Sequence, residues 1–210
     1  MPSYLVTGVS RGIGWAFLDV LSADENNTVI GLGRNKAAVE KAVAEKLPGR
    51  NIHLVEADIT DPSSLQTAAA ETAKLTGGGI DYLIANAGIV PTYDAYDPIG
   101  TLAANPSSVE SEMMTLFKVN VVGQIHLFNA FIPLLRQGTA KKVIAISSGQ
   151  AALDIIPKLK IDVAPLYSIS KGAMNIAVAK FAVQYAKEGI LFMSISPGLA
   201  HAEHFVDATP

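Results

Sequence analysis

The fold of this chain is decided by a glycine-rich stretch, Thr7-Gly8-Val9-Ser10-Arg11-Gly12-Ile13-Gly14. An apolar run of strand length, residues 4–7, leads into it, and a helical pattern over residues 13–21 follows it. Glycines at such a junction let the backbone turn tightly and approach a pyrophosphate without a Cβ in the way. Free N–H groups at the start of the helix offer further hydrogen bonds to phosphate oxygens. The stretch therefore predicts the first strand-to-helix turn of a dinucleotide-binding fold.

Apolar runs of strand length alternate with helical patterns along the rest of the chain. Further strands are expected over residues 28–32, 52–56, 82–85, 143–147 and 191–195. Helices are expected over residues 36–47, after Asp61-Pro62 as N-cap and first helical residue, over 107–136 and over 165–187. The alternation predicts an α/β fold, a doubly wound parallel sheet (Rossmann fold) of about six strands with helices on both faces. We expect one domain over residues 1–210.

Size and composition exclude several classes of protein. The chain has 210 residues, of which 50% are hydrophobic and 17% charged, and this suits one globular domain with a sizeable core. A net charge of −3 argues against a nucleic-acid partner, because phosphate binding needs clustered cations. No apolar run is long enough to span a membrane, and no secretion signal precedes the first strand. We therefore expect a cytoplasmic protein without a membrane partner.

The end of the second strand predicts which dinucleotide is bound. An NAD site usually places Asp or Glu there, where the carboxylate binds the ribose hydroxyls. Here Arg34-Asn35 follows the strand, and Arg34 with Arg11 could pair with a 2′-phosphate or could be two solvated arginines. We expect NADP(H) on this charge argument. Asp58-Ile59, after the third strand, could bracket the adenine, although Asp58 could equally be a turn residue.

A second group of residues indicates proton transfer to a carbonyl oxygen. Tyr167 and Lys171 are four positions apart and share one face of a helix. A nearby ammonium favours the phenolate, so we expect the pKa of Tyr167 to lie below its ordinary value of about 10. Ser148 could hold the substrate oxygen or only end the fifth strand. Asn120 could make a buried polar bond, or break its helix locally and hold a water.

Together these motifs resemble the short-chain dehydrogenase/reductase family. The matching segments are Thr7–Gly14, Asn86-Ala87-Gly88, Ser147-Ser148 and Tyr167-Ser168-Ile169-Ser170-Lys171, and the resemblance covers residues 3 to about 199. It implies a catalytic tetrad of Asn120, Ser148, Tyr167 and Lys171. In that reading Tyr167 protonates the carbonyl oxygen and Ser148 binds it. Lys171 holds the nicotinamide ribose and tunes Tyr167, and Asn120 anchors a water leading protons to Lys171.

The resemblance also extends the expected cofactor site. Asn86-Ala87-Gly88 would support the central sheet and touch the adenosine side, and Pro197-Gly198 would lie near the nicotinamide. The expected cofactor contacts are Thr7, Gly8, Ser10, Arg11, Gly12, Ile13, Gly14, Arg34, Asn35, Asp58, Ile59, Asn86, Ala87, Gly88, Tyr167, Lys171, Pro197 and Gly198.

The chain departs from the family pattern in three places. Tyr167 follows Ser148 by 19 positions, more than the family usually shows, so either residues 149–166 hold an insertion or Ser147 is the active hydroxyl; Ser148 is favoured. The run after Pro197-Gly198 lacks the threonine common there. The chain ends at Pro210, where family members usually continue with a substrate lid and a seventh strand. Either those residues are missing here or the protein is a shortened member.

Two irregular stretches, residues 89–106 and 149–166, follow strand ends and are expected to contact the substrate. Their apolar residues favour a small hydrophobic or aromatic ketone; they are Ile89, Val90, Ile155, Ile156 and Leu159. We expect no metal site, because His201 and His204 with Glu203 between them lack a third distant ligand. The helices that hold Asn120 and Met174 are apolar on more than one face, which favours a homodimer or homotetramer.

The expected function is reversible, NADPH-dependent reduction of a ketone or aldehyde to an alcohol. Two alternatives use the same features. A biosynthetic enzyme could use the tyrosine for a redox-neutral dehydration or cyclisation, and a non-catalytic protein could bind the dinucleotide alone. Turnover against a panel of carbonyl substrates separates the second alternative from an enzyme.

Overall fold

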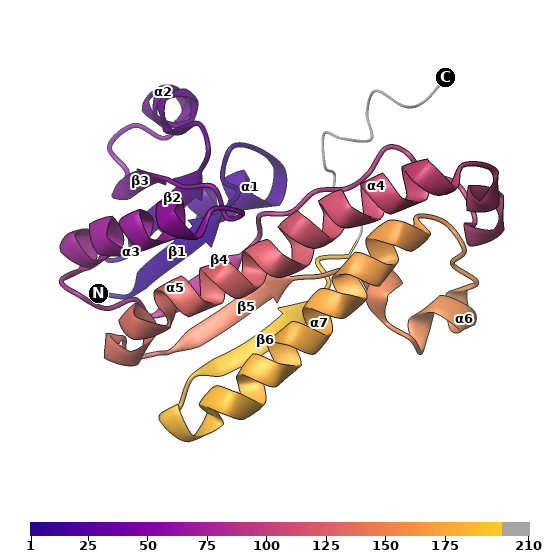
Figure 1. The fold of residues 1–210 in the computed structure, drawn as a ribbon. Helices are drawn as coiled ribbons and strands as arrows, with labels where there is room; N and C mark the ends of the chain where they lie inside the picture. The colour runs from indigo at the N-terminus through magenta and orange to yellow at the C-terminus, as the bar shows by residue number, and fades with distance from the viewer. Residues whose placement is uncertain (199–210) are drawn as a thin grey trace.

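The computed structural model describes residues 1–198, which form a six-stranded sheet between two layers of helices (Figure 1). The strands are β1 (Ser3–Thr7), β2 (Thr28–Gly33), β3 (Ile52–Glu56), β4 (Tyr82–Ala85), β5 (Lys142–Ile146) and β6 (Leu191–Ile195). They lie in the order β3-β2-β1-β4-β5-β6, and every neighbouring pair is parallel. The order reverses between β1 and β4, where a crevice forms at the carboxyl ends of the strands. The predicted doubly wound sheet is confirmed.

Helices cover both faces of this sheet. One layer holds α1 (Gly12–Ser22), which packs on β1 and β2, and α2 (Lys36–Lys46), which packs on β2 and β3. The other holds α3 (Pro62–Thr76), α4 (Pro106–Phe117), α5 (Gly123–Gln137) and α7 (Pro165–Tyr185). In Figure 1, α4 and α5 run end to end, with α3 beside α5 and α7 beside α4. Shorter elements are η1 (Ile99–Ala104), η2 (Lys118–Val122), η3 (Gly149–Ala151), α6 (Ile155–Leu159) and η4 (Ala186–Glu188). Asp61 caps α3 as predicted, since its side chain accepts from Ser63 N.

The helix expected over residues 107–136 is interrupted, and this part of the prediction was wrong. A π-helical turn, η2, separates α4 from α5. Asn120 lies in this turn with its side chain wholly buried and bonded to the backbone of Ile89, at 2.9 and 3.0 Å. A single π turn inside an α-helix changes the direction in which its side chains point, and such turns are frequent at functional sites. Apolar periodicity continues through it, and the one sign of the interruption was Asn120 itself, for which a local break of the helix was one of the two expected roles.

The two substrate-side stretches are more ordered than expected. Residues 89–106 contain η1, and residues 149–166 contain η3 and α6. A β-bridge between Pro98 and Val163 joins the two stretches. Figure 1 shows η1, α6 and the starts of α4 and α7 at one end of the molecule, beyond the carboxyl ends of the strands.

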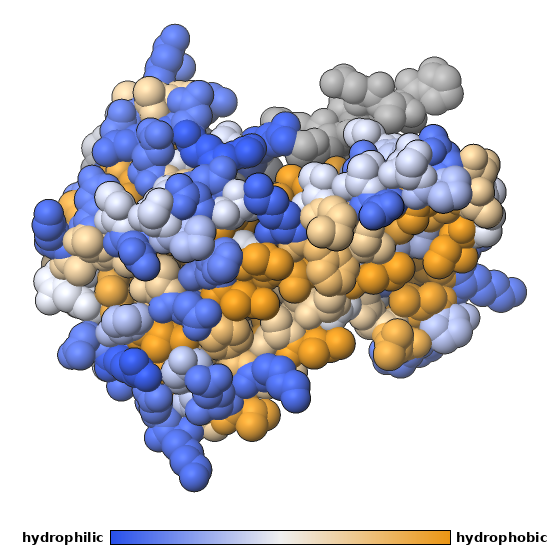
Figure 2. All heavy atoms as spheres, viewed as in Figure 1, coloured by the Kyte–Doolittle hydropathy of each residue, from blue (hydrophilic) through white to orange (hydrophobic). Residues whose placement is uncertain are grey.

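The outward face of the α4–α5–α7 layer is apolar. Figure 2 shows hydrophobic side chains gathered over these helices, whereas hydrophilic ones dominate over α2 and α3. Ile176 and Val183 of α7 are 64% and 80% exposed. Met114 of α4, Val122 of η2 and Ile169 of α7 are also exposed. Large exposed apolar areas mark surfaces that bind other proteins.

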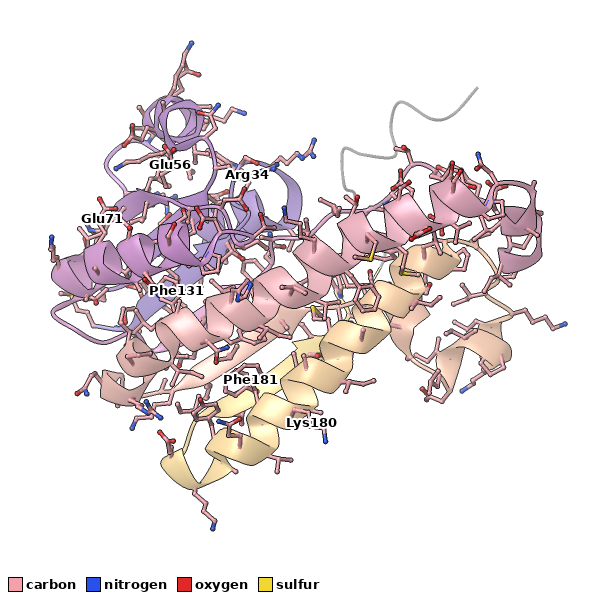
Figure 3. The ribbon with its side chains drawn as sticks, in the orientation of Figure 1. Arg34, Glu56, Glu71, Phe131, Lys180 and Phe181 are labelled. Carbon is pink, nitrogen blue, oxygen red and sulfur yellow. The ribbon has the colours of Figure 1, made fainter. Side chains whose placement is uncertain are left out.

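An aromatic cluster fixes α7 against the sheet. The ring centre of Phe128 in α5 lies 5.2 Å from that of Phe181 in α7 and 5.5 Å from that of Phe192 in β6, in both cases edge to face. Such pairs add to the stabilisation that burial alone gives. Figure 3 shows Phe181 on the inner side of α7 and Lys180 pointing away. The cluster therefore sets the rotation of the helix that carries Tyr167 and Lys171.

Candidate active site

The glycine-rich turn presents free backbone to the crevice. Helix α1 begins after Arg11, whose side chain makes no capping hydrogen bond, so α1 has no side-chain cap of its own. Gly12 has φ +56°, and a Cβ there would meet nothing within 4 Å. A Cβ on Gly14 would instead overlap the carbonyl oxygen of Gly8. The turn thus leaves an uncapped helix N-terminus facing open space, which suits a phosphate group.

Thr7 and Asn86 hold this turn to β4. Thr7 Oγ1 accepts from the N–H groups of Asn86 and Ala87, at 3.0 and 2.9 Å. The Asn86 amide donates back to Thr7 O and to Gly8 O, at 2.9 and 3.2 Å. Buried Gln124, which sequence analysis missed, donates to Ala87 O at 2.6 Å. These contacts fix the position of Gly88 beside the crevice.

A cavity of about 700 Å³ opens over this turn, and its size falls within the range of cofactor pockets. The expected contact residues that line it are Gly8, Ser10, Arg11, Gly12, Ile13, Arg34, Asp58, Ile59, Asn86, Ala87 and Gly88. Its lining also includes Ile89 and Val90, which were expected on the substrate side, and Thr60, Thr115, Lys118 and Val119, which sequence analysis did not select. The residues present therefore fit a nicotinamide dinucleotide.

Charge in the cavity lining is mostly positive. Arg11, Arg34 and Lys118 line it, with Asp58 as the one acid among its lining residues. One oxygen of Asp58 is already engaged, since Thr60 donates to it from both N and Oγ1 at 2.8 Å. Arg34 extends beyond the carboxyl end of β2 (Figure 3). Lys118 lies on the π turn, so only the three-dimensional fold could reveal it as a third cation.

The expected contact residues that lie outside this cavity lining are Thr7, Gly14, Asn35, Tyr167, Lys171, Pro197 and Gly198. Asn35 uses its side-chain oxygen to cap α2 at Ala38 N, 3.0 Å away. Thr7 and Gly14 lie beneath the turn and support it. Pro197 and Gly198 follow β6, and Gly198 N donates to Ser196 Oγ at 3.5 Å. Their contact with a cofactor stays a prediction.

Tyr167 and Lys171 lie on one face of α7 at the end of β5. Lys171 is 4% exposed, and its Nζ donates to Ile146 O at 2.8 Å. The same nitrogen lies 5.9 Å from the centre of the Tyr167 ring. Burial lowers the pKa of Lys171 to about 8. Burial also raises the pKa of Tyr167, and a hydrogen bond with Ser148 opposes that rise. This direction is opposite to the one expected from the lysine, because burial of the phenol has the largest effect on its pKa.

The two serines after β5 have different partners. Ser147 is buried, and its hydroxyl donates to Asn175 Oδ1 of α7 at 2.8 Å. Ser148 hydrogen-bonds the Tyr167 side chain and also accepts from Gln150 N at 3.2 Å. The long segment to Tyr167 contains η3 and α6 and still returns the chain to Ser148. The geometry favours Ser148 as the hydroxyl of the site.

Asn120 is joined to the same group through its amide. Besides its two bonds to Ile89, its Nδ2 donates to Ser170 Oγ at 3.1 Å. Ser170, which sequence analysis did not select, is fully buried and donates to Tyr167 O at 2.8 Å. Both amide hydrogens of Asn120 are therefore used within the protein. Its proposed water stays a prediction.

Neither a metal-binding cluster of side chains nor a membrane-spanning helix occurs within residues 1–198. In that part of the chain, no group of three or more His, Cys, Asp or Glu side chains could hold a metal ion. His201, Glu203 and His204 lie outside the described residues. No described helix combines the length and apolar composition needed to cross a bilayer.

Comparison with known proteins agrees with this arrangement. The family described as short chain dehydrogenase matches residues 3–209. The chain belongs to the short-chain dehydrogenase/reductase family. It is 53% identical to the short chain dehydrogenase virK of Hypocrea virens, over all of this chain and 78% of that protein. It is 51% identical to the short-chain dehydrogenase/reductase iacC of Pestalotiopsis fici, with the same coverage.

Solved structures of this family have the same fold. An NADPH-bound carbonyl reductase from chicken fatty liver superposes with a TM-score of 0.79 and 27% identity, over 94% of this chain and 76% of that one. A carbonyl reductase from Caenorhabditis elegans, described as putative, superposes with a TM-score of 0.76 and 25% identity, over 94% of this chain and 86% of that one. This short-chain dehydrogenase/reductase is thus an oxidoreductase of a family that binds nicotinamide dinucleotides.

The serine assignment can be tested with single substitutions. Ser148→Ala should lower carbonyl turnover at least about tenfold, because it removes the hydroxyl bonded to Tyr167. Ser147→Ala should lower the free energy of unfolding by about 1 kcal/mol and leave turnover closer to the parent, because it removes the bond to Asn175. Steady-state kinetics and urea unfolding measure the two effects. A larger turnover loss in Ser147→Ala would reverse the assignment.

Proposed function

We propose that this protein is an NADPH-dependent carbonyl reductase that converts a ketone or aldehyde to an alcohol, and the reverse. The observation that carries the proposal is the hydrogen bond between Ser148 and Tyr167, with buried Lys171 one helical turn away. Three groups that donate protons or hydrogen bonds thus gather beside Gly88, which lines the cavity and on which a Cβ would lie 3.3 Å from Lys171 Nζ. This arrangement suits a reaction in which negative charge develops on a carbonyl oxygen.

A bound NADPH would supply the hydride. Tyr167 then gives its proton to the carbonyl oxygen, and Ser148 donates a hydrogen bond to that oxygen. Lys171 has hydrogens left after its bond to Ile146 O; these would hold the nicotinamide ribose of a bound cofactor, and the charge of the amine would tune Tyr167. Asn120 keeps the π turn and the start of α7 together through Ser170.

Preference for NADPH over NADH is supported by the cations of the cavity. Arg11 and Arg34 are exposed, so they have room to meet a 2′-phosphate, and Lys118 adds a third positive charge. The chicken liver reductase was crystallised with NADPH bound. The acid that an NAD site would use is missing after β2.

A hydrophobic or aromatic substrate is supported by the apolar residues around the site. Ile89 and Val90 line the cavity directly. Leu153 and Leu159, in the segment between Ser148 and Tyr167, are 87% and 65% exposed. Apolar groups on this side favour a carbonyl compound with little polar surface.

The proton-transfer proposal is tested by Tyr167→Phe, which removes only the phenolic oxygen. Turnover should fall about a hundredfold or more, while NADPH binding and fold are kept. Lys171→Ala should be at least as harmful, because it removes both a charge beside Tyr167 and a ribose contact. Tyr185→Phe, on the same helix, is the matched control and should behave like the parent. NADPH oxidation with a panel of ketones and aldehydes is the measurement. Parent-like turnover in Tyr167→Phe would refute the mechanism.

Cofactor preference is tested by Arg34→Asp. The substitution removes a phosphate partner and adds a ribose acceptor, so NADH should bind more tightly than NADPH in the variant and less tightly in the parent. Dissociation constants for both dinucleotides measure this. Lys41→Asp makes the same charge change at an exposed position of α2 and should leave the preference unaltered. Equal affinities in the parent would contradict NADP(H) specificity.

We also propose that the apolar α4–α5–α7 face joins copies of this chain into a homodimer or homotetramer. The exposed Ile176 and Val183 support this assembly. Sedimentation at micromolar concentration should show no dominant monomer. A double change, Ile176→Glu with Val183→Glu, should release monomers, because it places charges on the apolar face. Val20→Glu changes a residue of α1 that is 71% exposed in the other helical layer, and it serves as the control. A parent that sediments as a clean monomer would exclude the assembly.

A further inference from the structure

Asp94 is a buried acid that the reaction scheme does not use. It lies in the stretch 89–106, yet its side chain is 0% exposed. Its Oδ2 accepts from Leu166 N at 2.8 Å, across 72 positions of sequence. Its Oδ1 is buried without a hydrogen-bond partner. Burying a carboxylate with one hydrogen bond is costly, so a residue kept in this state needs a physical reason.

Helix α7 explains what Asp94 does. The helix has Ala164 as its own N-cap residue, and alanine has no side-chain acceptor. Pro165 comes next and has no N–H group. Leu166 N is therefore the first main-chain donor of the helix, and Asp94 supplies its acceptor from elsewhere in the chain. The carboxylate also lies at the positive end of a 21-residue helix.

The backbone of Asp94 strengthens the same junction. Ala164 N donates to Asp94 O at 3.2 Å, and the bridge between Pro98 and Val163 lies beside it. Ala164 itself has φ +50°, a left-handed conformation that non-glycine residues rarely adopt. Such a conformation persists only where its surroundings hold it. Asp94 holds this conformation through two hydrogen bonds, one from the N–H of Ala164 itself and one from the N–H of Leu166, two residues later.

We propose that Asp94 is a positioning residue that caps α7 and thereby holds Tyr167 against Ser148. Tyr167 is the residue directly after Leu166, so a shift of the first turn moves the phenol. The same contacts fasten stretch 89–106 to stretch 149–166, so both substrate-side segments and the start of the catalytic helix form one unit. This inference rests on the proposed reductase function, which gives Tyr167 its role.

Two substitutions of Asp94 separate a capping role from a role in overall stability. Asp94→Ala removes the acceptor and should lower kcat about tenfold or more, because small misplacements of a catalytic group have large effects. The dissociation constant for NADPH should stay unchanged, since Asp94 is not among the residues that line the cavity. Asp94→Asn keeps a carbonyl oxygen for Leu166 N and should restore much of the lost kcat. Asp97→Ala removes an exposed acid of the same stretch and should match the parent.

Amide hydrogen exchange gives a readout that does not need turnover. Asp94→Ala should speed exchange in the segment that begins α7, while exchange in β1 stays as in the parent. The proposal is overturned if Asp94→Ala keeps the parent's kcat, if Asp94→Asn loses as much as Asp94→Ala, or if exchange at the start of α7 is unchanged. A parent that reduces no carbonyl compound would instead refute the proposed function. In that case exchange alone still decides whether Asp94 caps the helix.

Discussion

The amine of Lys171 lies inside the protein, and the surrounding structure is arranged to hold it there. Moving an ammonium out of water is costly unless hydrogen bonds replace its hydration, and burial accordingly lowers its pKa to about 8. The carbonyl of Ile146, at the end of β5, accepts one of its hydrogens. Gly88 leaves room beside it, since a Cβ there would lie 3.3 Å from Nζ. The carboxyl ends of two neighbouring strands thus meet at one nitrogen.

This constraint explains why motifs far apart in sequence occur together. Gly88 follows β4, Ser148 follows β5, and Asn120 lies between these strands in the π turn. Tyr167 lies one helical turn before the lysine. Parallel strands bring their carboxyl ends to one edge of the sheet, so residues at these positions converge. The order of the motifs along the chain is therefore the order in which the crossovers return to that edge.

Strands, most helices and the glycine-rich turn could be predicted because their signals are local. Apolar runs fixed the strands to within a residue, and Asp61-Pro62 marked a helix start that the structure confirms. Contacts between distant residues carried no such signal. Asp94 meets Leu166 across 72 positions, and Lys118 reaches the cavity only because a π turn re-aims it. The pKa direction at Tyr167 was missed for the same reason, since burial depends on what packs around the phenol.

The adjacent serines show how strand geometry resolves a choice that sequence leaves open. Successive side chains along an extended chain point to opposite sides. Ser147 therefore points to Asn175 within the α7 packing, and Ser148 points to Tyr167. The number of residues between the serines and Tyr167 does not decide which serine meets the phenol, because that segment folds into η3 and α6 before the chain returns to the site.

Buried polar side chains are concentrated where the site needs them. Within residues 1–198, seven of the eleven buried polar side chains lie at this end of the sheet: Thr7, Asp94, Asn120, Gln124, Ser147, Ser170 and Lys171. Each makes at least one hydrogen bond to the backbone or to another side chain. Apolar residues would fill the same space at lower cost, whereas a hydrogen-bonded network holds each member in one orientation. That network allows the phenol of Tyr167, the hydroxyl of Ser148 and the amine of Lys171 to be held close together before any substrate arrives.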